Sequence, residues 1–271
     1  MENQAGEALA MLYYAIFGFS QDCINMCFYF SNSKRSLDLS NRYKRNPDML
    51  EMSFEVFEGQ YRISGFAHPV CPIITASEYI DVAKWGLIPA WTKSESDAKK
   101  ISKMCLNAKT ETVFNLPSFY NPVLTKRCLI PATGYFEFHH RDGSAIPYYI
   151  FLKDEVIFSF GGLYDVWKSK SAENTMIKTF TILTVPANPL CSEIHNGGNN
   201  PGRMPLILNR EKEAEWLDPS LKKSEIQSFF QPFAADRMDA YPVANDFLKM
   251  RPYDESIIKP AGEPAGEYSY T

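Results

Sequence analysis

Apolar and polar residues alternate along much of the chain after residue 26, which is the pattern of strands with one buried face. The segment "LTKRCLIPATGYFEFHH" predicts two short strands around a Pro-Ala-Thr-Gly turn. The segment "PVCPIITAS", with prolines flanking a short apolar run, predicts an edge strand or a loop. Further strands are predicted at "CFYFSNS", "FEVFEGQYRISGF", "PYYIFL", "VIFSFGGLYDVW" and "TFTILTVPAN".

Helical periodicity is confined to a few short segments. Leu37, Leu39 and Tyr43 follow a loosely helical pattern. The segment "NREKEAEWLDPS" predicts the clearest helix, capped by Asn209 and stopped by Pro219, and "LKKSEIQSFFQPF" predicts another. The polar "TKSESDAKKISK" separates two apolar segments. Strands dominate without β-α-β alternation, so we predict an α+β fold with a largely antiparallel, curved or barrel-like β core and a few peripheral helices.

Composition narrows the class of protein. A chain of 271 residues with 45% hydrophobic content can bury one sizeable core, so we predict one large domain. The formal net charge of -4 excludes a generally basic nucleic-acid binder and requires any nucleic-acid site to be a local basic patch. None of the six cysteines forms a C-x-x-C pair, and the four histidines form no zinc motif, so reduced thiols in a cytoplasm and no metal are predicted.

Both ends of the chain read differently from its middle. The apolar run "ALAMLYYAIFGFS", residues 8–20, is short for a membrane span and has no preceding Lys or Arg, which disfavours a signal peptide. Met26 directly precedes Cys27, so we expect residues 1–25 to be an extension upstream of the true start or one that is removed. Residues 251–271, which repeat Pro-Ala-Gly-Glu, are expected to form a flexible acidic tail.

Several polar residues interrupt the apolar strands and are candidates for chemistry. On a strand, Tyr135, Glu137 and His139 share one face, and a carboxylate between two phenylalanines is either desolvated for acid–base work or paired. His195, before the loop Asn196–Gly202, is either a proton carrier or a structural histidine.

Three further residues allow two interpretations each. Asn107 is either a turn residue or a positioning amide, and Trp85 either fills core or stacks on a base. Arg203 either grips a phosphate or holds a structural carboxylate.

The ordered motifs "WGLIP-W", "LNAKTET", "RCLIPATGYFEF", "ILTVPAN", "EIH" and "RMPLIL" together resemble the SOS response-associated peptidase (SRAP) family. Members of that family shield abasic sites in single-stranded DNA. The resemblance runs from Cys27 to about Asp246 and implies a single SRAP domain over residues 27–250. Family sequences open with Met-Cys, so "MCFYF" looks like the family's start, with Cys27 exposed once Met26 is removed.

The resemblance also implies roles for individual residues. The catalytic set would be Cys27, Asn107, Glu137 and His195. The DNA-binding set would be Trp85, Lys109, Arg203, Arg42, Lys44 and Arg45. A terminal 1,2-aminothiol traps the aldehyde of an abasic sugar as a thiazolidine, which an internal cysteine cannot do. The implied partner is abasic single-stranded DNA bound by a monomer, without cofactor, metal or membrane.

Two other functions fit the same residues. A thiol peptidase would use Cys27 to remove its own N-terminal segment, with Glu137 and His195 as proton carriers. A non-covalent single-strand binder would show salt-sensitive binding that does not depend on Cys27.

Overall fold

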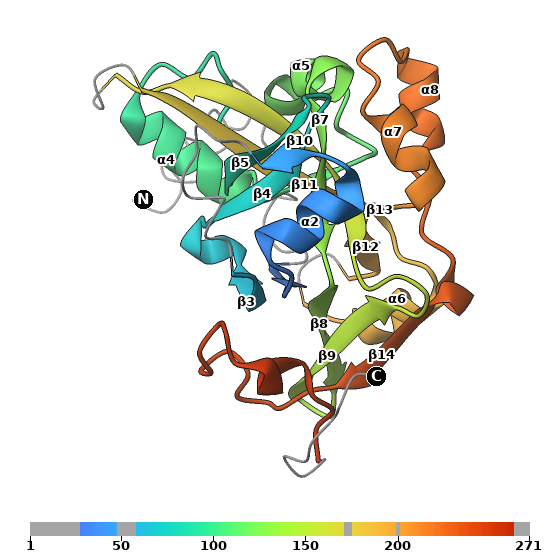
Figure 1. Cartoon of the computed structure of the whole chain (residues 1–271). Helices are drawn as coiled ribbons and strands as arrows, with labels where there is room; N and C mark the ends of the chain where they lie inside the picture. Colours follow the sequence, from blue (N-terminus) through green and yellow to red (C-terminus); the bar gives the residue numbers. More distant parts are fainter. Residues whose placement is uncertain (1–27, 48–57, 171–174, 199–200, 263–271) are drawn as a thin grey trace, which may run out of the picture.

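The computed structural model of the chain describes residues 28–47, 58–170, 175–198 and 201–262. Two sheets carry most of the ordered backbone, and short helices lie around them (Figure 1). The strands are β1 (Tyr29–Asn32), β2 (Asn46–Pro47), β3 (Gln60–Ser64), β4 (Val70–Ile74), β5 (Tyr79–Trp85), β6 (Asn107–Lys109), β7 (Arg127–Ala132), β8 (Gly134–Arg141), β9 (Ser144–Leu152), β10 (Phe158–Lys168), β11 (Met176–Pro186), β12 (Arg203–Pro205), β13 (Ile207–Leu208) and β14 (Met238–Pro242).

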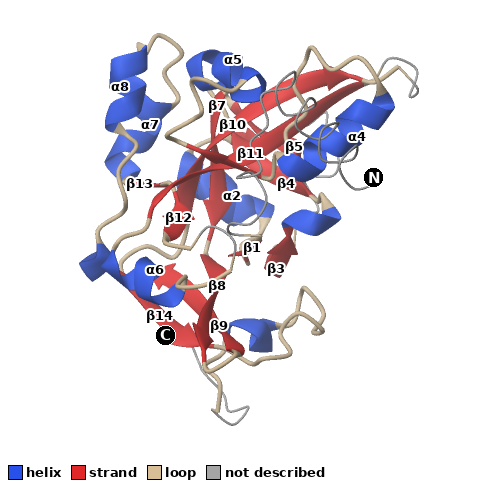
Figure 2. Ribbon diagram, turned by 180° about the vertical axis from the view of Figure 1, so that it is seen from behind, coloured by secondary structure: helices blue, strands red, loops and turns tan. Residues whose placement is uncertain are grey.

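The helices are short and lie around the sheets. Figures 1 and 2 show α4 on one side of the larger sheet, with α7 and α8 on the other. The α-helices are α2 (Ser36–Tyr43), α4 (Glu95–Met104), α5 (Pro117–Thr125), α6 (Pro189–Ile194), α7 (Glu213–Trp216) and α8 (Lys223–Ser228). The 3-10 helices are η2 (Gly65–Ala67), η3 (Arg210–Lys212), η4 (Ala235–Arg237) and η5 (Glu255–Ile258).

Five strands of the larger sheet close into a barrel. The ring runs β5, β4, β7, β10 and β11, and β11 returns to pair with β5. A ring with an odd number of strands cannot be antiparallel at every step, so one parallel pair is unavoidable, and it is β5–β11. The predicted α+β fold with a largely antiparallel, barrel-like core is therefore confirmed.

Aromatic side chains fill much of the barrel. Trp85 is fully buried and stacks on Phe180 with 5.9 Å between ring centroids. The ring of Phe30, from β1, reaches Trp85 at 5.2 Å and packs edge-on. Burial of such rings removes large apolar areas from water, so this cluster is a principal source of stability.

The second sheet has the order β14-β9-β8-β1-β3. Only Thr133 separates β7 of the barrel from β8 of this sheet. A Cβ on Gly134 would lie 2.3 Å from the Tyr149 ring, and the Tyr149 hydroxyl donates to the Thr133 carbonyl at 3.0 Å. The predicted turn is thus the corner where the chain passes from one sheet to the other.

Some local predictions need correction. The polar segment read as a connection contains α4, whose first turn is capped by the Ser94 side chain accepting from the Asp97 N–H. The single helix predicted at "NREKEAEWLDPS" is a 3-10 turn followed by the four-residue α7. Asn209 stands at the cap position, but its side chain accepts from Arg237 at 2.8 Å instead of capping.

The C-terminal segment is folded further than expected. Residues 251–262 include η5, and its Ile257 is completely buried against Phe247 and Val243. The expected flexible tail from residue 251 is therefore wrong for this part, and residues 263–271 lie outside the described residues. Within the described part of the chain, every helix is too short or too polar to cross a bilayer.

Candidate functional site

One face of β8 carries the candidate carboxylate, and α6 covers that face. Tyr135 and Glu137 are two positions apart on the strand and lie on the same face, as the sequence pattern predicts. The Tyr135 hydroxyl lies 3.1 Å from the sulfur of Cys191 in α6. Glu137 Oε2 lies 4.0 Å from Nε2 of His195, the residue that ends α6. The structure therefore brings two of the predicted catalytic residues, Glu137 and His195, face to face.

A backbone carbonyl fixes the orientation of the His195 ring. Nδ1 of His195 lies 3.1 Å from the carbonyl oxygen of Arg203. A carbonyl oxygen only accepts, so Nδ1 carries a proton and Nε2 is the nitrogen that faces Glu137. His195 and Glu137 are 7% and 6% exposed. The 4.0 Å between His195 Nε2 and Glu137 Oε2 is longer than a hydrogen bond, so the two groups are close neighbours that are not directly bonded.

An asparagine side chain ties the segment after His195 to β8. Asn196 Oδ1 accepts from the His140 N–H at 2.8 Å, and Asn196 Nδ2 donates to the His140 carbonyl at 3.0 Å. A Cβ on Gly197 would lie 2.6 Å from Cγ of the His140 ring, so a larger residue would displace the loop. The start of the segment Asn196–Gly202 is therefore a clamp that holds His195 beside the strand of Glu137.

Asn107 begins β6, which pairs in parallel with β11. Asn107 is opposite Ile182 and Lys109 is opposite Thr184. Asn107 is 2% exposed and Lys109 is half-buried. β11 also pairs with β12, so the strand of Asn107 and the strand of Arg203 flank the same end of β11.

Arg203 is engaged by protein groups at this strand end. Its guanidinium donates to the Thr184 carbonyl at 2.7 Å and forms a two-pronged ion pair with Glu111, which sequence reasoning missed. Burial is the largest single influence and acts to raise the pKa of Glu111, but the hydrogen bond and charge of Arg203, together with a backbone hydrogen bond and the Thr110 hydroxyl, outweigh it and leave that pKa below its usual value. The "LNAKTET" motif contains Glu111, yet nothing in its spacing indicates an arginine partner.

Cys191 is a thiol close to Glu137, and its environment keeps it protonated. Burial raises the pKa of Cys191 to about 12, the hydrogen bond from Tyr135 opposes this, and the nearby Glu137 charge adds to it. A thiol with that pKa is not a thiolate nucleophile at neutral pH. Cys191 therefore packs the back of the site and does not compete for an electrophile.

The expectation that Trp85 stacks on a base is wrong. Trp85 is 0% exposed, and its indole N–H donates to the Leu106 carbonyl at 2.8 Å. It is the core filler between Phe30 and Phe180. The alternative interpretation of this tryptophan, as part of the core, is the one that the structure shows.

Arg42 is likewise a structural residue and not an exposed phosphate ligand. Its guanidinium donates to both Glu213 oxygens at 3.0 and 2.9 Å and to the Ile157 carbonyl at 3.2 Å. Lys44 and Arg45 line a separate pocket with Arg42, whose lining includes none of the residues Asn107, Glu137 and His195. The structure therefore does not bring these three cations to the candidate site.

Cys27 lies outside the described residues, and the chain is described from Phe28 onward. β1 runs antiparallel to β8 with Tyr29 opposite Phe136 and Phe30 opposite Tyr135. Continuing that register by one position sets Phe28 against Glu137. Phe28 itself is held to η2, because its carbonyl accepts from the Gly65 N–H at 2.8 Å and its ring centroid lies 4.4 Å from that of Phe66.

Comparison with protein families matches residues 26–250 to the model described as "SOS response associated peptidase (SRAP)". A relative from Bacillus subtilis (strain 168), named abasic site processing protein YoqW, is 38% identical over 195 residues, which are 69% of this chain and 82% of that protein. The Gallus gallus protein named abasic site processing protein HMCES is 29% identical over 182 residues, covering 59% of this chain and 51% of that protein.

A crystal structure of a protein from Bacteroides thetaiotaomicron superposes with a TM-score of 0.83 at 45% identity. The match covers 87% of this chain and 100% of that one. The chain therefore shares its fold with that protein over most of its length.

Proposed function

The chain belongs to the SOS response associated peptidase family, and on that premise we propose that it recognises abasic sites in single-stranded DNA and crosslinks to them through Cys27. Relatives named abasic site processing proteins support the DNA-lesion role. The observation that carries the crosslinking step is the register of β1 and β8. It directs the chain at Phe28 toward Glu137 and the adjacent His195.

The reaction needs an amine and a thiol on one residue. The ring-opened abasic sugar presents an aldehyde at C1′. The α-amine of Cys27 adds to that carbon, and loss of one water leaves an imine. The Cys27 sulfur then bonds to the imine carbon while the thiol proton passes to the nitrogen, which closes a five-membered thiazolidine. No oxidant, reductant or metal takes part.

The neighbouring residues supply proton transfer and positioning. Glu137 accepts a proton from the Cys27 ammonium, because only a neutral amine attacks a carbonyl. His195, in its doubly protonated form with Nδ1–H held by the Arg203 carbonyl, delivers its Nε2 proton to the sugar ring oxygen as the ring opens, and the C1′ hydroxyl loses its proton to water. Asn107 orients the cysteine without adding charge, and Lys109 binds a flanking phosphate. Arg203 holds Glu111, so it would bind a phosphate only by exchanging that carboxylate for it.

This chemistry requires a free N-terminal Cys27. The family match begins at Met26, which supports the proposal that the active form starts there. With residues 1–25 attached, the nitrogen of Cys27 is an amide and cannot form the imine. Either translation from Met26 followed by removal of that methionine, or cleavage of the extension, yields the active form.

The test compares wild type with Cys27→Ala, both bearing a free N-terminus at residue 27, on single-stranded DNA with one abasic site. Wild type is expected to give a heat-stable band on a denaturing gel, and Cys27→Ala none. The alanine variant keeps its α-amine, so borohydride should trap its imine and restore a band. A heat-stable band from Cys27→Ala without borohydride would refute the thiazolidine. Cys27-dependent chain cleavage without DNA dependence would support the peptidase function instead.

A further inference from the structure

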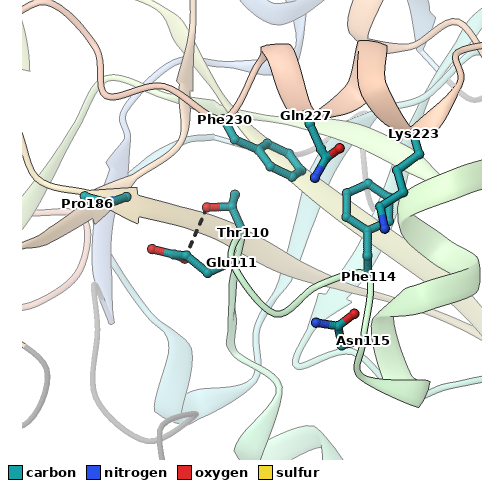
Figure 3. Close-up of a pocket in the computed structure, with 8 residues that line it drawn as sticks. All are labelled: Thr110, Glu111, Phe114, Asn115, Pro186, Lys223, Gln227 and Phe230. Atoms are coloured by element: carbon teal, nitrogen blue, oxygen red, sulfur yellow. Dashed lines mark hydrogen bonds between the residues drawn. The ribbon is translucent and has the colours of Figure 1, made fainter.

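A pocket of about 360 Å³ lies between the segment that follows β6 and the helix α8, a size typical of small-ligand sites. Figure 3 shows side chains from the α8 region facing those of the 110–115 segment across it. The lining residues are Thr110, Glu111, Phe114, Asn115, Pro186, Lys223, Gln227 and Phe230. Lys223 and Gln227 are one helical turn apart, so both project from the same face of α8. We propose that this pocket binds the base of a nucleotide next to the abasic site.

The surfaces of the pocket match the parts of a nucleobase. The rings of Phe114 and Phe230 lie 6.1 Å apart with their planes tilted by 40°, and the half-buried Phe230 ring is the apolar face on which a base would stack. Asn115 and Gln227 are exposed and carry amides that both donate and accept, as the edges of bases do. Lys223 Nζ lies over the face of the Phe114 ring, 4.9 Å from its centroid, and so adds a cation to the pocket that attracts a polyanion.

A run of protein contacts links the pocket to the candidate site. Thr110 directly follows Lys109, and its N–H and hydroxyl both donate to the Thr184 carbonyl at 3.1 Å. Glu111 lines the pocket and is ion-paired to Arg203, so its negative charge is offset where a phosphate would pass. The Arg203 carbonyl in turn accepts from His195. One run of contacts therefore joins the pocket to the reacting residues.

A pocket for a neighbouring base would help to position the abasic nucleotide at the candidate site. The lesion has no base, so the protein cannot grip the reacting nucleotide by stacking. Phosphate contacts repeat along the strand and do not fix which nucleotide faces Glu137. A neighbouring base held in the pocket would set the register of the strand. This inference rests on the proposed function, since it assigns the pocket to the same DNA.

The experiment combines base removal in the DNA with blocking of the pocket in the protein. Oligonucleotides carry one abasic site and, at a single neighbouring position, either a base or an unreactive tetrahydrofuran spacer. Crosslinking rates at subsaturating protein are read from denaturing gels. For wild type, removal of the base at one neighbouring position should slow crosslinking about tenfold, and removal elsewhere should have little effect.

Gln227→Trp, which fills the pocket from an exposed position on α8, should slow the base-containing substrate about tenfold and leave the spacer substrate unchanged. Ser224→Trp, also exposed on α8 but outside the lining, is the matched control and should behave as wild type. The effects of removing the base and of Gln227→Trp on the crosslinking rate should thus be non-additive, as expected for groups in contact.

The two proposals fail in different ways. Equal rates for spacers at every position, or independent effects of base removal and Gln227→Trp, would overturn the pocket assignment while crosslinking itself stands. Absence of crosslinking to every oligonucleotide would overturn the proposed function and this inference together. A different result would be inhibition of crosslinking by short peptides where base-containing oligonucleotides do not inhibit it. If Gln227→Trp abolished that inhibition, the pocket would be assigned to a peptide and the proposal of a bound nucleobase would be overturned.

Discussion

At the scale of single residues, the site depends on three hydrogen bonds to the backbone that no sequence motif predicts. The Arg203 carbonyl sets which nitrogen of His195 is protonated, and His140 presents both its N–H and its carbonyl to Asn196. The alternation of Tyr135 and Glu137 on one strand face could be predicted from the sequence, since it needs only the period of a strand. The partners could not, because His140 and Asn196 are 56 residues apart.

Asn196→Ala tests the clamp. Removal of the side chain breaks two hydrogen bonds worth about 1 kcal/mol each and loosens His195 relative to Glu137. We expect crosslinking to slow by about tenfold, with a shift in the pH dependence of its rate, because the histidine that moves the proton is no longer held.

Asn121→Ala, at an exposed position of α5, is the control and should match wild type. Asn196→Asp keeps an acceptor for the His140 N–H and should recover part of the rate. Cooperative unfolding in urea should be retained in all three variants. An unchanged rate and an unchanged pH profile for Asn196→Ala would show that the clamp does not position His195.

At the scale of elements, the strand pattern and two of the helices, α2 and α8, could be predicted from the sequence, whereas α4 and the position of β4 in its sheet could not. Prolines at "PVCPIITAS" indicated an edge, yet β4 lies between β5 and β7. The prediction failed because β4 meets β7 only at Ile74 opposite Leu129, beyond Pro72, so no ladder bond to β7 is lost there. α4 was missed because only Ala98, Ile101 and Ser102 in it are buried, too few apolar positions for a visible stripe.

Arg42 shows how a basic residue can look like a DNA ligand and be structural instead. It joins α2 to Glu213 of α7 and also lies 3.6 Å from Glu155. Arg42→Ala would leave the buried Glu213 without its ion-pair partner and with only the Ser159 hydroxyl, so we expect the free energy of unfolding to fall by about 3–5 kcal/mol.

Urea denaturation followed by tryptophan fluorescence measures that loss. Lys44 directly follows α2 and is exposed, so Lys44→Ala should change the free energy of unfolding by less than about 0.5 kcal/mol. The folded fraction of Arg42→Ala should crosslink abasic DNA at the wild-type rate. Unchanged stability together with weaker DNA binding would return Arg42 to the DNA-contacting set.

At the scale of the whole molecule, an acidic protein is proposed to act on a polyanion. With a net charge of -4, binding must rely on a few local cations, and Lys109, Arg203 and Lys223 are those near the proposed strand path. β6 and β12 both pair with β11 of the closed barrel, and the Arg203 carbonyl of β12 contacts His195, which lies beside Glu137 of β8. The monomeric state and the cytoplasmic location stay predictions.

The fold class and the order of the motifs could be predicted from the sequence because both depend on local pattern. The fate of Trp85 could not, since a tryptophan before a Gly-Leu-Ile-Pro turn looks the same whether it faces core or solvent. Only closure of the barrel through the β5–β11 pair decides it. The proximity of Glu137 and His195 likewise depends on α6 docking onto β8.

The most direct test of the central claim compares two forms of the protein on one denaturing gel. One form is expressed from Met26, the other is the full 271-residue chain with its intact N-terminus verified by mass spectrometry. Each is mixed with single-stranded DNA that carries one abasic site. A heat-stable shifted band is predicted for the Met26 form alone, since only that form has a free α-amine beside the Cys27 thiol. An equally strong band from the full chain with residues 1–25 still attached, or no band from either form, would contradict the account.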